Sequence, residues 1–141
     1  MKNGSLQNNA LELAGHDLQF YCHKASAEAG WWHDPHSGAD LKAHGNEGTR
    51  FGKALVAEKL CLIHSEVSEA MEGHRKGLMD DKLPHRPMLE VELADAVIRI
   101  ADLCGAMGYD LGGAIAEKCA FNAVRPDHKP ENRAAAGGKA Y

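Results

Sequence analysis

The spacing of apolar residues along the chain predicts four α-helices and no strands. Apolar and small residues recur at three- and four-residue steps in four segments. These segments span residues 9–29, 51–76, 87–107 and 111–125. Pro87 suits a first helical position, Asp110 can cap the last helix, and Pro126 would end it. We therefore expect an all-α protein with a four-helix bundle-like core.

The connections between these segments are polar and rich in turn-forming residues. Residues 31–50, which include Trp31, Trp32 and several Gly, His and Asp residues, predict a long loop. The segment after Arg125, "PDHKPENRAAAGGKAY", lacks apolar periodicity. We expect one domain over residues 1–125 and a polar C-terminal tail over residues 126–141.

Three glutamates of the second predicted helix occur at three-residue intervals. Each residue turns the direction around a helix by about 100°, so the position of each glutamate relative to the apolar arc can be calculated. That arc consists of Val56, Leu60, Ile63, Val67, Ala70 and Met71, with Leu55 and Leu62 extending it. Glu66 falls inside the extended arc and Glu69 at its edge, whereas Glu72 points away. We expect Glu66 and Glu69 to be partly buried and Glu72 to lie on the surface.

The third predicted helix carries a polar stripe between two apolar faces. The stripe consists of Glu92, Asp95, Arg99 and Asp102. A helix that is apolar on two sides is normally enclosed by other helices, so the stripe should face an interior groove. Carboxylates from two helices would then converge. At ~5 Å and an effective dielectric constant of ~20, each pair would repel by roughly 3 kcal/mol. Either protons together with Arg99, or a metal ion, must offset this repulsion.

The chemistry of these candidate ligands favours a hard divalent cation. Oxygen donors suit Mg²⁺ or Mn²⁺, and Mg²⁺ commonly binds together with substrate phosphates. A phosphorylated substrate is therefore expected. One alternative is that the carboxylates are surface residues paired with Lys or Arg. A di-iron bundle would need Glu-x-x-His pairs, which this sequence lacks.

Charge and composition limit the classes of partner that the protein is expected to bind. A net charge of −4 and a pI near 6.1 argue against non-specific electrostatic binding to nucleic acid or to a membrane surface. No apolar run approaches the ~18 residues needed to span a bilayer, and the first residues lack the apolar core of a secretion signal. We expect a cytoplasmic protein that binds neither nucleic acid nor membranes.

Two segments resemble a known family. "SEVSEAMEG" and, after 22 residues, "EVELADAVIRIADLC" resemble the E-x-x-E … E-x-x-D signature of the MazG-like all-α nucleoside triphosphate pyrophosphohydrolases. The resemblance continues through "GWW", "EKCAFNAVRP" and "GGKAY", so it covers most of the chain from Gly30 onward. The loop over residues 34–50 and the "PDHKPENRAAA" segment are longer than expected, and such loops commonly set substrate choice.

The resemblance implies a hydrolase that cleaves a nucleoside triphosphate between the α- and β-phosphates, releasing a nucleoside monophosphate and pyrophosphate. It implies Mg²⁺ as cofactor, with Mn²⁺ as a substitute. The implied metal ligands are Glu66, Glu69, Glu92 and Asp95. We favour Glu69 as the residue that accepts a proton from water. Lys118 and Asn122 match the K-x-x-x-N element of the family, and Arg125 and Lys139 are further candidates for phosphate binding.

Two questions stay open at the level of sequence. Trp31 and Trp32 are candidates for stacking on a nucleobase; Trp32 is our candidate substrate contact, although packing of at least one of the two rings against the bundle is the simpler interpretation. The alternative functions are hydrolysis of another phosphorylated compound, such as a phosphoribosyl intermediate, or a non-catalytic helical module whose acidic groove docks a basic partner.

The apolar faces, like the family resemblance, also predict a homodimer or a higher homo-oligomer.

Overall fold

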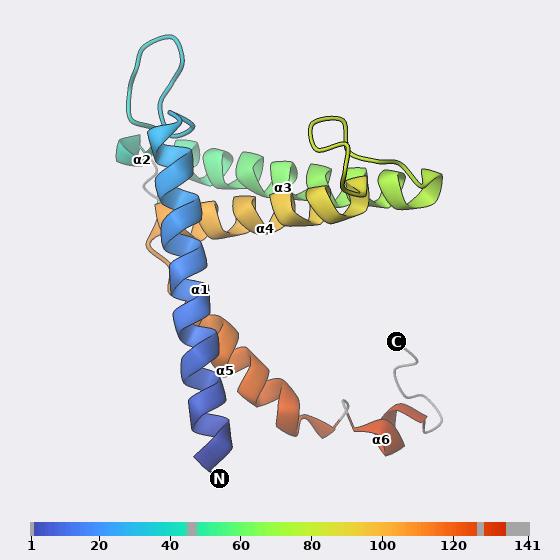
Figure 1. Cartoon of the computed structure of the whole chain (residues 1–141). Helices are drawn as coiled ribbons and strands as arrows, with labels where there is room; N and C mark the ends of the chain where they lie inside the picture. The colour runs from blue at the N-terminus through green and yellow to red at the C-terminus, as the bar shows by residue number, and fades with distance from the viewer. Residues whose placement is uncertain (1, 45–47, 127–128, 135–141) are drawn as a thin grey trace. The chain divides into compact units, whose positions relative to one another are not determined.

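The computed structural model describes residues 2–44, 48–126 and 129–134. Over these residues the chain forms six helices and no strands, which confirms the all-α class (Figure 1). The helices are α1 (Lys2–Glu28), α2 (Leu41–His44), α3 (Arg50–Lys76), α4 (Met88–Met107), α5 (Leu111–Val124) and α6 (Pro130–Ala134). None of the helices in these ranges is both long and apolar enough to cross a membrane.

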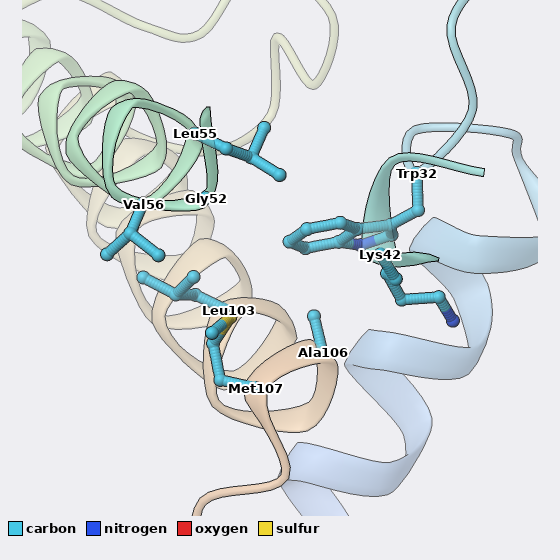
Figure 2. Close-up of a pocket in the computed structure, with 8 residues that line it drawn as sticks. All are labelled: Trp32, Lys42, Gly52, Leu55, Val56, Leu103, Ala106 and Met107. Atoms are coloured by element: carbon cyan, nitrogen blue, oxygen red, sulfur yellow. The ribbon is translucent and has the colours of Figure 1, made fainter. Parts of the chain in front are cut away.

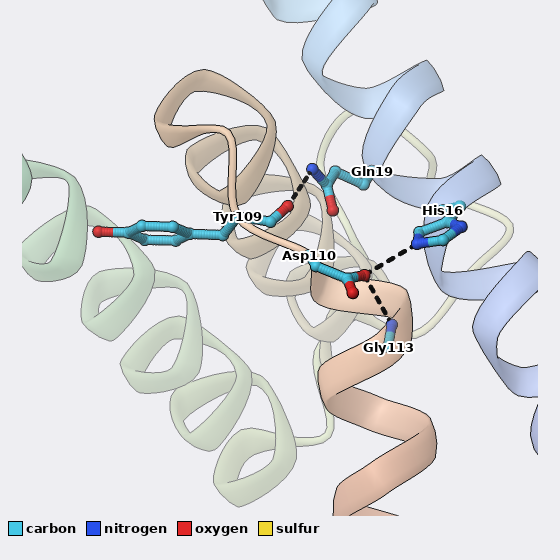
Figure 3. Close-up of polar contacts among 5 residues, drawn as sticks. All are labelled: His16, Gln19, Tyr109, Asp110 and Gly113. Carbon is cyan, nitrogen blue, oxygen red and sulfur yellow. Dashed lines mark hydrogen bonds and ion pairs between the residues drawn. The ribbon is translucent and has the colours of Figure 1, made fainter.

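The ends of the long helices follow local signals in the sequence. The side chain of Thr49 accepts a hydrogen bond from Gly52 N and caps α3, and Gly77 ends that helix with φ 61°. Asp110 accepts a hydrogen bond from Gly113 N at 2.8 Å, which confirms its predicted capping role in α5 (Figure 3). In contrast, α1 begins seven residues before its expected start. The sequence pattern did not predict these first turns, because they carry no apolar periodicity.

The chain divides into two compact units. The first comprises Met1–Asp17 with Asp110–Tyr141, and the second comprises Leu18–Tyr109. In the first unit α1 and α5 approach closely, since a Cβ atom added to Gly15 would lie 2.6 Å from the Cα atom of Gly112. The expected boundary at residue 126 stays a prediction; the short helix α6 lies within the expected tail.

The second unit is built around the pairing of α3 with α4, which lie side by side (Figure 1). At one end of this pair, the Trp32 ring packs against Leu55 of α3 and Leu103 of α4 (Figure 2). Trp32 is 1% exposed and is the largest fully buried side chain among the described residues. This cluster fixes the loop after α1 against the helix pair.

The buried face of α3 differs from the predicted one. Leu60, Val67 and Met71 were expected in the core, but they are 48%, 51% and 59% exposed. The residues that α3 buries are Gly52, Leu55, Glu66, Ala70 and Gly73. Small side chains account for this shift, because they let α4 approach closely: a Cβ atom added to Gly73 would lie 2.9 Å from the Met88 side chain. Large apolar side chains of α3 are consequently left on the surface of the single chain.

Candidate metal site

Three of the four predicted metal ligands meet between α3 and α4. One carboxylate oxygen from each of Glu66, Glu92 and Asp95 lies within 4.8 Å of the others. Glu66 and Glu92 are only 5% and 8% exposed, which confirms the expected burial of Glu66. Such a group of oxygen donors fits a hard divalent cation, Mg²⁺ or Mn²⁺. We call these three residues the acidic group.

Glu69, the fourth predicted ligand, lies outside the acidic group. Its side chain is exposed, so the expectation that it is partly buried is wrong. The reason is the shift of the buried face of α3, which buries Glu66 against α4 and leaves Glu69 exposed at the edge of the acidic group. Glu69 is still close enough to Glu92 for its charge to raise the pKa of that residue. Its proposed roles as ligand and base stay predictions.

The acidic group concentrates negative charge in a partly dry environment. The pKa of Glu92 rises from 4.5 to about 7, chiefly because burial disfavours its charged form. A hydrogen bond with Glu66 and the negative charges of Glu69, Glu66 and Asp95 raise it further. Burial and the charge of Glu66 also raise the pKa of Asp95. Near neutral pH, Glu92 therefore binds a proton easily, and a cation can take the place of that proton.

Arg99 provides part of the positive charge that the converging carboxylates require. Its Nε donates a hydrogen bond to Glu66 Oε1 at 2.7 Å, and its charge opposes the rise in the pKa of Asp95. The Arg99 side chain is 43% exposed, whereas that of Glu66 is 7% exposed. Arg99 therefore anchors the Glu66 carboxylate from the solvent side, but Glu92 and Asp95 keep raised pKa values beside it.

Asp80 is a further carboxylate near the acidic group that sequence reasoning missed. It lies in the loop between α3 and α4, is 6% exposed, and raises the pKa of Asp95. Backbone amides of Lys82 and Leu83 donate hydrogen bonds to its Oδ1 atom at 2.9 and 2.5 Å. These local bonds give Asp80 a structural role in the loop turn. The sequence offered a signal in the turn-forming "DDKLP" segment, but none for proximity to Asp95.

Asp102, from the polar stripe of α4, connects three segments of the second unit. It is 8% exposed, as expected for a stripe that faces inward. Its Oδ1 atom accepts hydrogen bonds at 2.8 Å from the ring nitrogens His23 Nδ1 and Trp32 Nε1. Trp32 is thereby held in the core, whereas Trp31 is 68% exposed. Of the two rings, Trp31 is the one available to a ligand.

The remaining predicted substrate contacts lie on α5 or at its C-cap in the first unit, or outside the described residues. Lys118 and Arg125 both extend over the Phe121 ring, at 5.0 and 5.7 Å from its centroid. The Oδ1 atom of Asn122 is buried and accepts no hydrogen bond from the described part of the chain. This segment therefore carries one unused acceptor and two cationic side chains. Lys139 lies outside the described residues.

One side-chain contact lies within each unit close to the boundary between the two units. In the first unit, His16 Nε2 lies 2.8 Å from Asp110 Oδ1 (Figure 3). In the second, Gln19 Nε2 donates a hydrogen bond to the Tyr109 carbonyl oxygen at 2.7 Å (Figure 3). These contacts are structural, because they satisfy a helix cap and a carbonyl group after the end of α4.

Comparison of the chain with protein-family models, curated proteins and solved structures gives no match. The functional assignment therefore depends on the side chains described above and on the motif resemblance.

The raised pKa of Glu92 predicts how stability depends on pH without metal. Between about pH 4.5 and 7 the folded protein holds a proton on Glu92 that the unfolded chain has lost. The free energy of unfolding should therefore fall as pH rises through this window, by an amount of the order of 3 kcal/mol. Urea unfolding at pH 5 and pH 8 would measure the fall, and Mg²⁺ at pH 8 should reverse part of it.

Glu92→Gln removes the titrating group and should flatten this pH dependence. Glu72→Gln is the matched control, because Glu72 forms surface ion pairs with Arg75 and Lys76 on the same helix as Glu66. The control should follow the unmodified protein. An equally steep fall in the Glu92→Gln variant would refute the assignment of the raised pKa.

Proposed function

We propose that this protein is a Mg²⁺-dependent nucleotide pyrophosphohydrolase that cleaves a nucleoside triphosphate between its α- and β-phosphates. The observation that carries the proposal is the acidic group, in which Glu66, Glu92 and Asp95 bring three oxygen donors from two helices within 4.8 Å. The order of the E-x-x-E and E-x-x-D motifs, and their resemblance to the MazG-like family, support the same conclusion. We expect the protein to act in the cytoplasm.

The chemistry proposed for the site assigns a task to each side chain. A divalent ion held by Glu66, Glu92 and Asp95 would neutralise phosphate charge and lower the pKa of a bound water. Arg99 keeps the Glu66 carboxylate in position through its 2.7 Å hydrogen bond. Water oxygen bonds to the α-phosphorus, the bond from that phosphorus to the bridging oxygen breaks, and pyrophosphate leaves. Glu69, exposed at the rim, accepts the proton of the water.

We assign substrate contacts to the predicted polar residues and to Trp31. Lys118, Asn122, Arg125 and Lys139 are proposed to bind phosphate or sugar oxygens. Trp31 takes the stacking role considered for Trp32, because the Trp32 ring is 1% exposed and bonded to Asp102. An exposed indole offers a flat apolar face to any base, and base–aromatic stacking contributes about 1–3 kcal/mol.

The proposed functional form is a homodimer or a higher homo-oligomer in which helices of neighbouring copies complete a bundle-like core. Apolar side chains exposed on α3 and α4 support this proposal. They are Leu60, Val67, Met71, Leu93, Val97 and Ile100, each between 39% and 59% exposed. Apolar area of this kind on paired helices is typical of a surface that another protein covers.

Substitution of the acidic group tests the enzymatic proposal. Glu66→Gln and Asp95→Asn should each reduce pyrophosphate release by at least about a hundredfold, because outer-shell changes alone commonly cost 10- to 100-fold. Circular dichroism should show unchanged helicity, since relieving repulsion does not disturb the fold. Glu72→Gln should keep near-normal turnover. An Asp95→Asn variant with normal turnover would exclude the acidic group as the metal site.

The same assay separates the alternative functions. Mg²⁺-dependent cleavage of a phosphoribosyl compound, without cleavage of any nucleoside triphosphate, would favour the same-fold hydrolase. Failure to cleave either class, together with binding of a basic protein partner, would favour the interaction module.

Sedimentation across a dilution series tests the oligomer. We expect a species of at least two chains at every concentration at which the protein is folded and active. Met71→Glu places a charge among the exposed apolar residues and should weaken the assembly, whereas Glu72→Gln should not. A folded, active monomer at submicromolar concentration would contradict the proposal.

A further inference from the structure

A cavity of about 420 Å³ adjoins the acidic group within the second unit. Its lining includes Asp95 and Arg99 from α4, Leu62 from α3, and Trp31 from the loop after α1. This volume falls in the range of ~300–1,000 Å³ that is usual for small-molecule sites. The cavity therefore has room for a ligand that also reaches the acidic group through Asp95.

The two ends of this cavity differ in chemistry. Asp95 and Arg99 lie at the end that belongs to the acidic group. Asp102 lines the same cavity seven residues further along α4, which corresponds to about 10 Å along a helix axis. Leu62 and Ile98 contribute apolar surface to the lining, and Lys59 contributes a second positive charge. A ligand that matches this lining carries phosphate at one end and a flat, partly apolar group with polar edges at the other.

At its end of the cavity, Asp102 provides a hydrogen-bond acceptor. Both hydrogen bonds that reach Asp102 from described residues end on Oδ1, the one from His23 and the one from Trp32. The second oxygen, Oδ2, accepts none from this part of the chain. An ionised carboxylate accepts hydrogen bonds and donates none, so its free oxygen selects a ligand group that donates. The exposed Trp31 ring supplies a surface on which a base can stack.

We infer that this cavity binds the nucleoside part of the substrate and that Asp102 selects bases with an exocyclic amino group. Cytosine, adenine and guanine each present such an N–H donor. Uracil, thymine and hypoxanthine carry a carbonyl oxygen at the corresponding ring position of cytosine or adenine. They still donate through the neighbouring ring N–H, but an exocyclic oxygen that faced Oδ2 would be repelled. This inference rests on the proposed function, since it identifies the substrate class of the same site.

Paired nucleotides that differ only in an amino or an oxo group test the inference. We would measure kcat/KM for dCTP against dUTP and for dATP against dITP, and the affinities of the matching monophosphates by calorimetry. In at least one pair the amino form should be favoured by about tenfold or more, because a site built to accept a hydrogen bond at the exocyclic position discriminates against an analogue that places an acceptor there. Equal kcat/KM values and equal affinities within both pairs would overturn the inference, whatever any variant does.

Asp102→Asn provides the reciprocal test. The asparagine Oδ1 can still accept from His23 and Trp32, while its Nδ2 donates where Oδ2 accepted. The amino-to-oxo ratio should therefore fall by about tenfold or invert. A purely structural role would lower both substrates of a pair equally and would contradict the assignment. Asp110→Asn is the matched control, because Asp110 also bonds to a histidine at 2.8 Å, and it should leave the ratio unchanged.

The binding measurements separate this inference from the proposed function. If no nucleotide releases pyrophosphate but dCMP or dAMP binds more tightly than its oxo counterpart, and Asp102→Asn reverses that order, the proposed reaction fails and the base site stands. If pyrophosphate is released from amino and oxo nucleotides alike, with equal affinities for their monophosphates, the reaction stands and the base site fails.

Discussion

Repulsion among buried carboxylates is the physical constraint on the acidic group, which is the proposed metal site of this protein. Glu66 and Glu92 are almost fully removed from water, and Asp95 lies within 4.8 Å of both. Apolar residues at such buried positions often leave a protein as stable or make it more stable. Arg99 offsets one charge, and the pKa of Glu92 still rises to about 7. This arrangement supports the proposed cation site.

The pairing of α3 with α4 forms the acidic group and also shapes the rest of the second unit. Small residues such as Gly73 let the helices approach closely enough for their carboxylates to meet. The same pairing leaves large apolar side chains, Val67 and Met71 among them, on the surface of the single chain. Beyond the acidic group, the Trp32–Asp102 hydrogen bond fixes the loop that carries Trp31. The proposed metal site, the proposed base site and the proposed oligomer surface thus all depend on one helix pair.

The sequence predicted the four long helices because apolar spacing and capping residues such as Asp110 are local signals. It also predicted the burial of Glu66, since the direction of a side chain around a helix follows from its position. The exposure of Glu69 was missed because the buried face depends on how closely α4 packs, which is a tertiary property. The partners of Asp102 were missed for a similar reason: His23 and Trp32 lie 79 and 70 residues away in the sequence.

The identity of the reaction products decides whether this protein is a nucleotide pyrophosphohydrolase. Phosphorus-31 NMR of an amino-bearing nucleoside triphosphate incubated with the protein distinguishes cleavage at the α–β bond from cleavage at the β–γ bond. With Mg²⁺ we expect nucleoside monophosphate and pyrophosphate to appear in equal amounts, and neither to appear when EDTA replaces the metal. Formation of nucleoside diphosphate and inorganic phosphate, or the same turnover in EDTA, would contradict the account.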